Sequence, residues 1–421
     1  MLTRRNLLHA GVTSGLGLVV SSWLERVARA DTAPGAKTAP SAAKAKSVIL
    51  LYMNGGPSHI DTWDPKTGKV AGPAKSIKTS VPGVMISEHM PQLARVANKL
   101  AIVRGMTSKE GNHQRAQYLL RTGYSPNPTV AHPTLAAWVA KRFGEPATGL
   151  PGSVSIGGPS IGAGFFGVQY GPFVVQTPGQ LPQNVGYGPG VDDARFEARK
   201  GLLDGLDSSF ATQTGDVKIE GRRQLYGKAD RLMHASSLKA FDVSEETEAV
   251  RNAYGDTAFG RGCLTAARLV ASGVRFVEVT LDGWDTHTDV FDRTKSLMGT
   301  LDPAMAALLE DLQRRGIADS TLVVWMGDFG RTPNINGNGG RDHFPNAWSA
   351  VLAGGGIRGG VVHGETDADG AKVVKDAVTV PNLLATIATT LGMDPAEMAQ
   401  SPAGRPIALT DGGAPVKALL V

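Results

Sequence analysis

The sequence has only one cysteine in 421 residues, Cys263. It therefore cannot form an intramolecular disulfide, and it cannot build a zinc site from several thiolates. Cys263 lies in an apolar stretch with helical character, which is typical of a small core residue rather than of a nucleophile. The sequence also lacks a dinucleotide-binding glycine fingerprint, a haem-attachment motif and the cysteines of an iron–sulfur cluster, and these absences argue against an oxidoreductase built on such cofactors.

The folded part of the chain has no excess charge of either sign. The formal net charge is +5, and all of it falls within residues 1–46, which carry seven basic and two acidic residues. A basic patch on the folded domain is thus not indicated, and we expect no nucleic-acid partner.

The first 30 residues have the zones of an export signal. Arg4 and Arg5 form a twin-arginine pair, a weakly apolar run follows, and Ala28-Arg29-Ala30 fits a small-x-small cleavage site. We therefore predict a twin-arginine signal peptide over 1–30, a location in the periplasm or cell envelope, and no stable membrane span after cleavage. A buried N-terminal helix and an uncleaved anchor are the alternatives.

Residues 31–46 are rich in Ala, Pro, Lys and Thr and show no apolar period, which predicts a flexible linker. Residues 47–421 are long enough for one large domain. Within it, a polar helical insertion is expected near 192–242, and loops with short strands are expected over 149–190.

Apolar runs and amphipathic stretches alternate along the rest of the domain. Strands are expected at 47–53, 100–104, 274–281, 321–326 and 347–352, and helices at 91–99, 112–123, 134–143, 245–272, 294–315 and 380–391. This alternation predicts an α/β fold, a three-layer α/β/α sandwich with a mostly parallel central sheet. Ligands of such sheets bind beyond the carboxyl ends of the strands.

Three expected strands end in polar segments that contain close Asp and His pairs. Carboxylates with neutral imidazoles suit divalent ions such as zinc or manganese, with calcium also possible. The candidate ligands exceed the needs of one tetrahedral ion, so one or two ions are expected. They are His59, Asp61, Asp285, His287, Asp328, Asp342 and His343.

Each of these residues also has a structural interpretation. Asp61 or Asp64 could cap the turn before Pro65. Asp285 could cap its loop, and His287 could be an ordinary surface side chain. Arg331 could grip a phosphate or sulfate group through two parallel hydrogen bonds, or it could form a salt bridge with one of the carboxylates.

Several motifs together resemble one bacterial family, the domain of unknown function fifteen-oh-one. They are NGGPSHIDTWDPK at 54–66, GNHQRAQYLLRTG at 111–123, GWDTHTD at 283–289, GDFGRTP at 327–333, GRDHF at 340–344 and GRPI at 404–407. The resemblance covers the chain after the linker. It implies an alkaline-phosphatase-like fold, shared with sulfatases, and hydrolysis or transfer of phosphate or sulfate esters at a metal site.

The resemblance also implies roles for single residues. Asp285 and His287 look like an Asp and His ligand pair, and His343 looks like the last His ligand. Asp328 takes the place of a ligand Asp, but Phe329 stands where a His ligand is usual. Asn54 stands where the first strand usually ends in a ligand Asp, and we assign it to substrate binding.

The nucleophile is the largest departure from the superfamily pattern. Leu120-Arg121-Thr122-Gly123 resembles the sulfatase motif, and the position ten residues before its glycine is His113. His113 is thus our candidate catalytic residue, as a nucleophile, ligand or general acid/base. Thr107 and Ser108 are rival hydroxyl nucleophiles.

The sequence therefore predicts an exported metal-dependent hydrolase that acts on a small anionic phosphate or sulfate ester. The alternative is a catalytically degenerate protein on the same fold, which binds a metal or helps assembly in the envelope with a protein partner.

Overall fold

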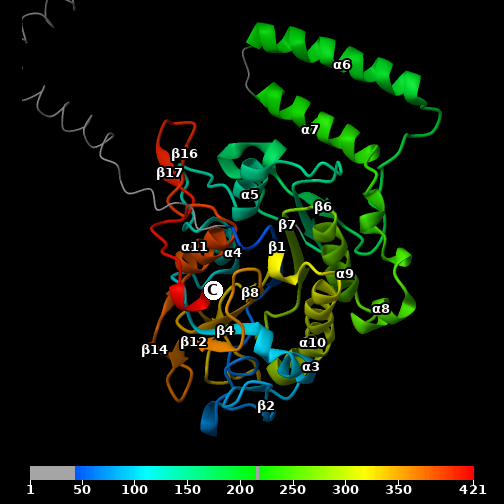
Figure 1. Ribbon diagram of the computed structural model, residues 1–421. Helices are drawn as coiled ribbons and strands as arrows, with labels where there is room; N and C mark the ends of the chain where they lie inside the picture. Colours follow the sequence, from blue (N-terminus) through cyan, green and yellow to red (C-terminus); the bar gives the residue numbers. More distant parts are fainter. Residues whose placement is uncertain (1–42, 159, 215–217) are drawn as a thin grey trace, which may run out of the picture. The chain divides into compact units, whose positions relative to one another are not determined.

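The computed structural model describes residues 43–158, 160–214 and 218–421. The expected signal peptide and most of the expected linker lie outside these residues. Within them, a nine-stranded central sheet has the order β12-β4-β11-β8-β1-β7-β5-β6, with β15 beside β4 (Figure 1). The strands are β1 (Ser47–Met53), β4 (Leu100–Thr107), β5 (Ser153–Ile156), β6 (Phe173–Val175), β7 (Phe276–Leu281), β8 (Thr321–Gly327), β11 (Trp348–Gly354), β12 (Val361–His363) and β15 (Val378–Thr379).

Most strands of this sheet run in one direction. The central strand β1 pairs in parallel with both β7 and β8, so that Leu51 lies beside Val279 on one side and Trp325 on the other. β11 is antiparallel to its neighbours β8 and β4. The carboxyl ends of β1, β4, β7 and β8 consequently meet at one edge of the sheet, as predicted for this fold class.

Alternate residues of β1 point into two separate cores. Ile49, Leu51 and Met53 belong to one core cluster, and Val48, Leu50 and Tyr52 belong to the other. This period of two explains why the strand reads as an unbroken apolar run, because both of its faces are buried.

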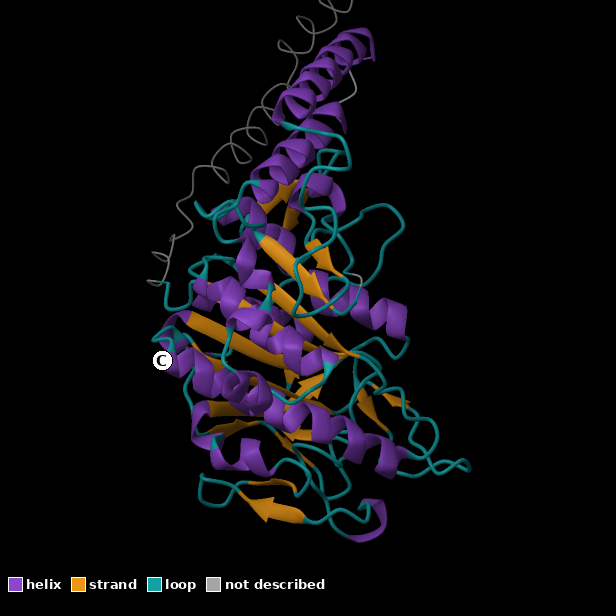
Figure 2. Cartoon of the chain, turned by 90° about the vertical axis from the view of Figure 1, so that its right-hand side faces the viewer, coloured by secondary structure: helices purple, strands orange, loops and turns teal. Residues whose placement is uncertain are grey.

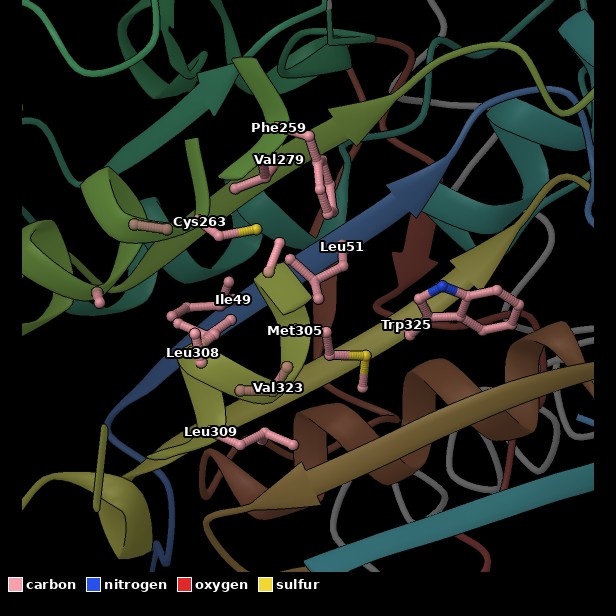
Figure 3. Packing of buried hydrophobic residues seen from close by; sticks show 14 of the residues in the cluster. Ile49, Leu51, Phe259, Cys263, Val279, Met305, Leu308, Leu309, Val323 and Trp325 are labelled. Atoms are coloured by element: carbon pink, nitrogen blue, oxygen red, sulfur yellow. The ribbon is translucent and has the colours of Figure 1, made fainter. Parts of the chain in front are cut away.

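Helices cover both faces of the sheet (Figure 2). The first core is closed by α3 (Pro91–Arg95), α9 (Ala258–Ala271) and α10 (Val290–Arg314), and the second by α4 (His113–Thr122), α5 (Leu135–Phe143) and α11 (Val380–Thr390). In the first core, Cys263 of α9 lies among apolar side chains such as Ile49 and Leu51 (Figure 3). Burial raises the pKa of its thiol. The predicted three-layer α/β/α fold is confirmed.

The helix that follows β4 is bounded by the residues that the sequence indicated. Asn112 is the N-cap of α4, and its side chain accepts a hydrogen bond from Arg115 N at 3.3 Å. Gly123 ends the helix with a left-handed φ of 78°, which glycine adopts at little cost. Consequently His113 occupies the first position of α4, at the carboxyl edge of the sheet.

Two helical predictions differ from the structure. The stretch 245–272 forms two helices, α8 (Glu248–Ala253) and α9, because Gly255 takes a φ of 79° and Thr257 starts a new helix as an N-cap. The helix expected at 294–315 begins earlier, at Val290, whose amide donates to Gly339 O at 3.1 Å across a distant loop. Neither boundary can be inferred from apolar periodicity alone.

The region near 192–242 contains α6 (Asp193–Thr214) and α7 (Lys218–Met233), which pack against each other (Figure 1). Smaller two-stranded sheets join β2 (Ser76–Lys78) to β3 (Met85–Ser87) and β9 (Gly330–Arg331) to β10 (His343–Phe344). Every helix in the described parts of the chain is too short or too polar to cross a bilayer.

Candidate metal centre

Four loops bring polar side chains together at the carboxyl edge of the sheet. Asp285 and His287 follow β7, Asp328 follows β8, and His113 opens the helix after β4. His343 arrives on β10, where it pairs with Arg331 of β9.

One carboxylate oxygen is the hub of this cluster. Asp285 Oδ1 lies 3.3 Å from His113 Nε2, 3.2 Å from His287 Nε2 and 3.3 Å from His343 Nε2. His287 Nε2 and His343 Nε2 are 3.0 Å apart. One ligand atom from each of His113, Asp285 and His343 lies within 4.8 Å of the other two, so these three residues could hold a metal ion.

The outer nitrogen of each imidazole is held by an acceptor. His113 Nδ1 lies 2.6 Å from Asp328 Oδ2, His287 Nδ1 lies 2.8 Å from Asp342 Oδ1, and His343 Nδ1 lies 2.8 Å from the carbonyl oxygen of Gly111. A carbonyl can only accept, and Asp342 also accepts from Asn336 Nδ2 at 3.0 Å. The Nδ1 atoms are therefore assigned as the donors, so that the Nε2 of each imidazole is the atom that can bind either a metal ion or a second proton.

Nε2 lone pairs that face one carboxylate oxygen repel it unless a cation, either a proton or a metal ion, lies among them. Zinc bonds to nitrogen and oxygen are about 2.0–2.1 Å long, so the edge of a zinc tetrahedron is about 3.3 Å. The separations of 3.2–3.3 Å from Asp285 Oδ1 match that edge. His113 Nε2 is buried and has no hydrogen-bond partner among the described residues. His113, Asp285 and His343 thus fit a divalent ion of the zinc type, with outer acceptors that orient the imidazoles. His287 lies beside this group, in contact with Asp285 and His343.

The Arg331 guanidinium holds the Asp285 carboxylate in place. Its Nη2 lies 2.5 Å from Asp285 Oδ1 and also donates to the carbonyl of Gly55. Its other nitrogens bind backbone carbonyls, Nε that of Gly56 at 2.9 Å and Nη1 that of Arg341 at 3.1 Å. Burial alone would raise the pKa of Asp285, but the hydrogen bond and charge of Arg331 and the nearby imidazoles lower it to about 2. Asp285 is therefore ionised at neutral pH.

This arrangement answers the question that the sequence left open for Arg331. The side chain is fully buried, and four of its five N–H groups are used within the protein. It forms the salt bridge with Asp285 that was one of its two interpretations.

Asp328 is completely buried, and its contact with the cluster is the one with His113 Nδ1. Its Oδ2 also accepts from Gly55 N at 3.2 Å, and its Oδ1 accepts from the hydroxyl of Tyr52. Phe329, next in sequence, packs against the rings of His113 and His343 with centroid distances of 4.9 and 4.7 Å. Phe329 thus packs against two of the imidazoles.

From Asp328, the polar contacts continue through Tyr52 to a buried ion pair in the second core. The Arg121 guanidinium lies 3.8 Å from the Tyr52 ring centroid, and its Nη2 lies 2.5 Å from Glu278 Oε1. Sequence reasoning missed Tyr52 and Glu278. Their signal was a polar side chain inside an apolar strand, which needs a buried partner.

Two candidate ligands lie outside the cluster. Asp61 is buried and bound to Arg341, whose Nε lies 2.8 Å from its Oδ2, and it accepts from Ser58 Oγ at 2.5 Å. His59 is buried with its Nε2 2.8 Å from Gly370 O. Burial lowers the pKa of His59, so it is neutral at pH 7. Both residues hold neighbouring loops together.

Asn54 and the hydroxyl candidates take other positions around the edge. Asn54 Nδ2 donates to Asp282 Oδ1 at 2.6 Å, and its Oδ1 accepts from Gln117 Nε2 at 2.7 Å. Ser108 Oγ accepts from Glu110 N at 3.2 Å, and Thr107 lies where β15 pairs with β4.

A pocket opens beside the cluster. It has a volume of about 490 Å³ and includes Asp342 and Asn336, which hold His287, together with Phe344, Asp369 and Lys69. This size is within the range of small-molecule sites.

Residues 45–420 match a family described as "Protein of unknown function (DUF1501)". The chain belongs to this family. No curated protein matches the sequence.

Solved structures with a similar fold have very different sequences. The lipoteichoic acid synthase LtaP from Listeria monocytogenes is 11% identical, with a TM-score of 0.40 over 88% of this chain and 75% of that one. A protein in the alkaline phosphatase superfamily from Vibrio parahaemolyticus is 13% identical, with a TM-score of 0.37 over 84% and 68%. The periplasmic domain of EcEptC from Escherichia coli, a complex with Zn, is 10% identical, with a TM-score of 0.38 over 91% and 93%. At these values the likeness concerns the fold alone.

Proposed function

We propose that this DUF1501 protein is an exported metal-dependent hydrolase of phosphate or sulfate esters. The observation that carries the proposal is the convergence of three imidazole Nε2 atoms on Asp285 Oδ1, each imidazole being oriented by an acceptor at its Nδ1. His113, Asp285 and His343 would hold the ion, and His287 would be a further ligand from its place beside Asp285 and His343. Asp328, Asp342 and Gly111 O would orient the imidazoles.

A divalent ion at such a site supplies Lewis-acid polarisation of an ester oxygen and makes nearby water more acidic. The protein side chains supply the rest. Arg331 and the N–H of Gly55 keep the carboxylates of Asp285 and Asp328 in place. The pocket beside Asp342 offers room for the alcohol part of the ester.

Export rests on the twin-arginine pair and the cleavage pattern in the first 30 residues. The site is compatible with it, since folding before transport would allow the ion to be inserted first.

A second function, metal binding without catalysis in envelope assembly, is favoured by one observation. Arg331, the arginine next to the hub, has its N–H groups committed to the protein rather than to the pocket. An anionic substrate would thus lack an arginine partner at this position.

Metal analysis of the purified full-length protein, followed by assays with aryl phosphate, sulfate and phosphonate monoesters, tests both functions. We expect bound divalent metal and turnover of at least one ester, with loss of both in His343→Ala and in Asp285→Ala. His363→Ala, on the edge strand β12, is the matched histidine control and should behave as wild type. Stoichiometric metal without turnover across the panel would favour the non-catalytic function, and protein that binds no metal would overturn both.

A further inference from the structure

A second pocket lies between helix α7 and the strands β5 and β6. Its volume is about 320 Å³, and none of its lining residues belongs to the candidate metal centre. The volume is within the range of small-molecule sites.

One wall of this pocket is the apolar face of α7. Leu225, Ala229, Leu232 and Met233 line the pocket at spacings of four, three and one residues, which places them on one side of the helix. Leu232 also belongs to the first core cluster, whereas Leu225 and Ala229 are exposed where they line the pocket.

Other parts of the lining are mixed. Phe173 and Val174 of β6 and Val185 are apolar, whereas Gln169, Gln183 and Asn184 are polar. Val168, Val174 and Leu225 line the pocket although they are 65%, 46% and 47% exposed. Exposed apolar side chains that gather at one mouth are typical of a ligand site.

One end of the pocket carries excess positive charge. Lys228 Nζ lies 3.0 Å from Glu145 Oε1, and Arg231 Nη2 lies 2.6 Å from Glu145 Oε2. Two cations therefore share a single carboxylate. The Lys228 ammonium has three N–H donors, which leaves donors free for a further anion.

A buried hydroxyl at the same end has no partner. Ser153, the first residue of β5, is only 2% exposed and lines the pocket, and its Oγ makes no hydrogen bond within the described residues. The preceding residue, Gly152, lies close to the backbone of Gly144, since a Cβ built on Gly152 would be 2.9 Å from Gly144 O. Because Glu145 follows Gly144 in the chain, Ser153 lies near the segment that contains Glu145. Buried polar groups are nearly always satisfied, so this hydroxyl indicates a missing polar partner.

We propose that this pocket binds a medium-chain carboxylate. The carboxylate would bind at Lys228 and the Ser153 hydroxyl, and the alkyl chain would lie along the apolar face of α7. Lys228 favours an anion, because Glu145 beside it is also neutralised by Arg231 outside the lining, and the apolar face of α7 favours an alkyl chain. The proposal is independent of the metal centre.

Calorimetric titration of the full-length protein with dodecanoate tests the pocket. We expect saturable binding at one site, lost in Ala229→Trp, because Ala229 is an exposed residue of the lining and the indole would block the mouth of the pocket. Gln224→Trp adds the same ring to an exposed position of the same helix outside the lining and should bind as wild type. Circular dichroism of each variant checks that the helices are retained. Absence of binding to wild type, or equal binding to Ala229→Trp, would overturn the proposal.

Substitution Lys228→Met tests the charge without removing the apolar stem. Dodecanoate should bind about tenfold more weakly, since a hydrogen bond to a charged group is lost. Dodecanol should bind the wild type more weakly than dodecanoate does, and it should bind Lys228→Met and wild type equally. If the alcohol binds wild type as tightly as the acid, the assignment of an anionic ligand is wrong.

Discussion

Asp328 Oδ2 lies 2.6 Å from His113 Nδ1, although 215 residues separate the two in the chain. The contact joins the loop after β8 to the start of the helix after β4, and it fixes which nitrogen of His113 faces Asp285. Because Asp328 is fully buried and already accepts from Tyr52 and Gly55, the carboxylate has little freedom to move. The imidazole is thus pre-oriented for an ion by the fold itself.

The first prediction concerns this contact. Asp328→Asn keeps the size of the side chain but removes the charge that holds His113. We expect the affinity for zinc to fall by about 10–100-fold, as is typical when an outer partner of a ligating histidine is lost. Competition with a chromogenic chelator measures it.

Asp282→Asn is the matched control, since Asp282 is an exposed aspartate at the same sheet edge that contacts Asn54 rather than an imidazole. It should leave the zinc affinity unchanged. Equal affinities for Asp328→Asn and wild type would show that His113 does not depend on Asp328.

The second prediction concerns Gly55, whose φ is 114°. A Cβ at this position would collide with Asp285 N and lie 2.7 Å from the carbonyl carbon of Trp284. Gly55→Ala should therefore lower the free energy of unfolding by more than the cost of left-handed backbone alone, which is about 1–2 kcal/mol, and should also weaken metal binding by displacing Asp285. Urea unfolding and zinc titration measure the two effects.

Gly68→Ala separates the two causes. Gly68 also has a positive φ of 81°, but a Cβ there meets nothing within 4 Å. It should show only the backbone cost and normal zinc affinity. If both variants lose the same stability and bind zinc equally well, the close approach of Gly55 to Asp285 has no consequence.

The sequence predicted the central strands well because both faces of the sheet are buried. Ser47–Met53 was expected as a strand over its full length, since every residue in it is buried and all those after Ser47 belong to one of the two cores. The short strands β12 and β15 were not expected. They pair with β4 through backbone hydrogen bonds that three or two residues can make without any apolar period.

The sheet edge was also foreseeable, but not the contacts within it. Parallel strands end at one edge, so Asp285, His287 and Asp328 could be placed together from their positions after strands. The sequence does not tell whether a loop turns its polar side chain inward or away. Asp61 follows β1 in the same manner as Asp285 follows β7, yet it turns to the buried Arg341. The direction of the Asp61 side chain thus depends on Arg341, which is 280 residues away in the chain.

The third prediction concerns pH. Glu246 Oε1 accepts from Arg268 and Arg315, each at 2.7 Å. Burial alone would raise the pKa of Glu246, but these hydrogen bonds and charges outweigh it and lower the pKa. Its contribution to stability is then fully present above the unfolded pKa of about 4.3 and is lost as the pH falls through the lower folded value.

Urea unfolding at pH 7 and at pH values below about 4.3 should therefore show a drop in stability that is smaller in Glu246→Gln than in wild type. Glu245→Gln, at the neighbouring and more exposed position, is the control and should keep the wild-type drop. An identical pH dependence in Glu246→Gln and wild type would contradict this role.

The fourth prediction concerns the buried pair beneath the metal centre. The side chains of Arg121 and Glu278 are 6% and 4% exposed and in contact, and Arg121 also covers the Tyr52 ring. Arg121→Met leaves Glu278 as an unpaired buried charge, so we expect a loss of about 3–5 kcal/mol in the free energy of unfolding. Combining it with Glu278→Gln removes that charge and should recover part of the loss, because desolvating an isolated carboxylate is the main cost. A double variant less stable than Arg121→Met would contradict this account, because it would mean that the unpaired charge of Glu278 is not the main cost.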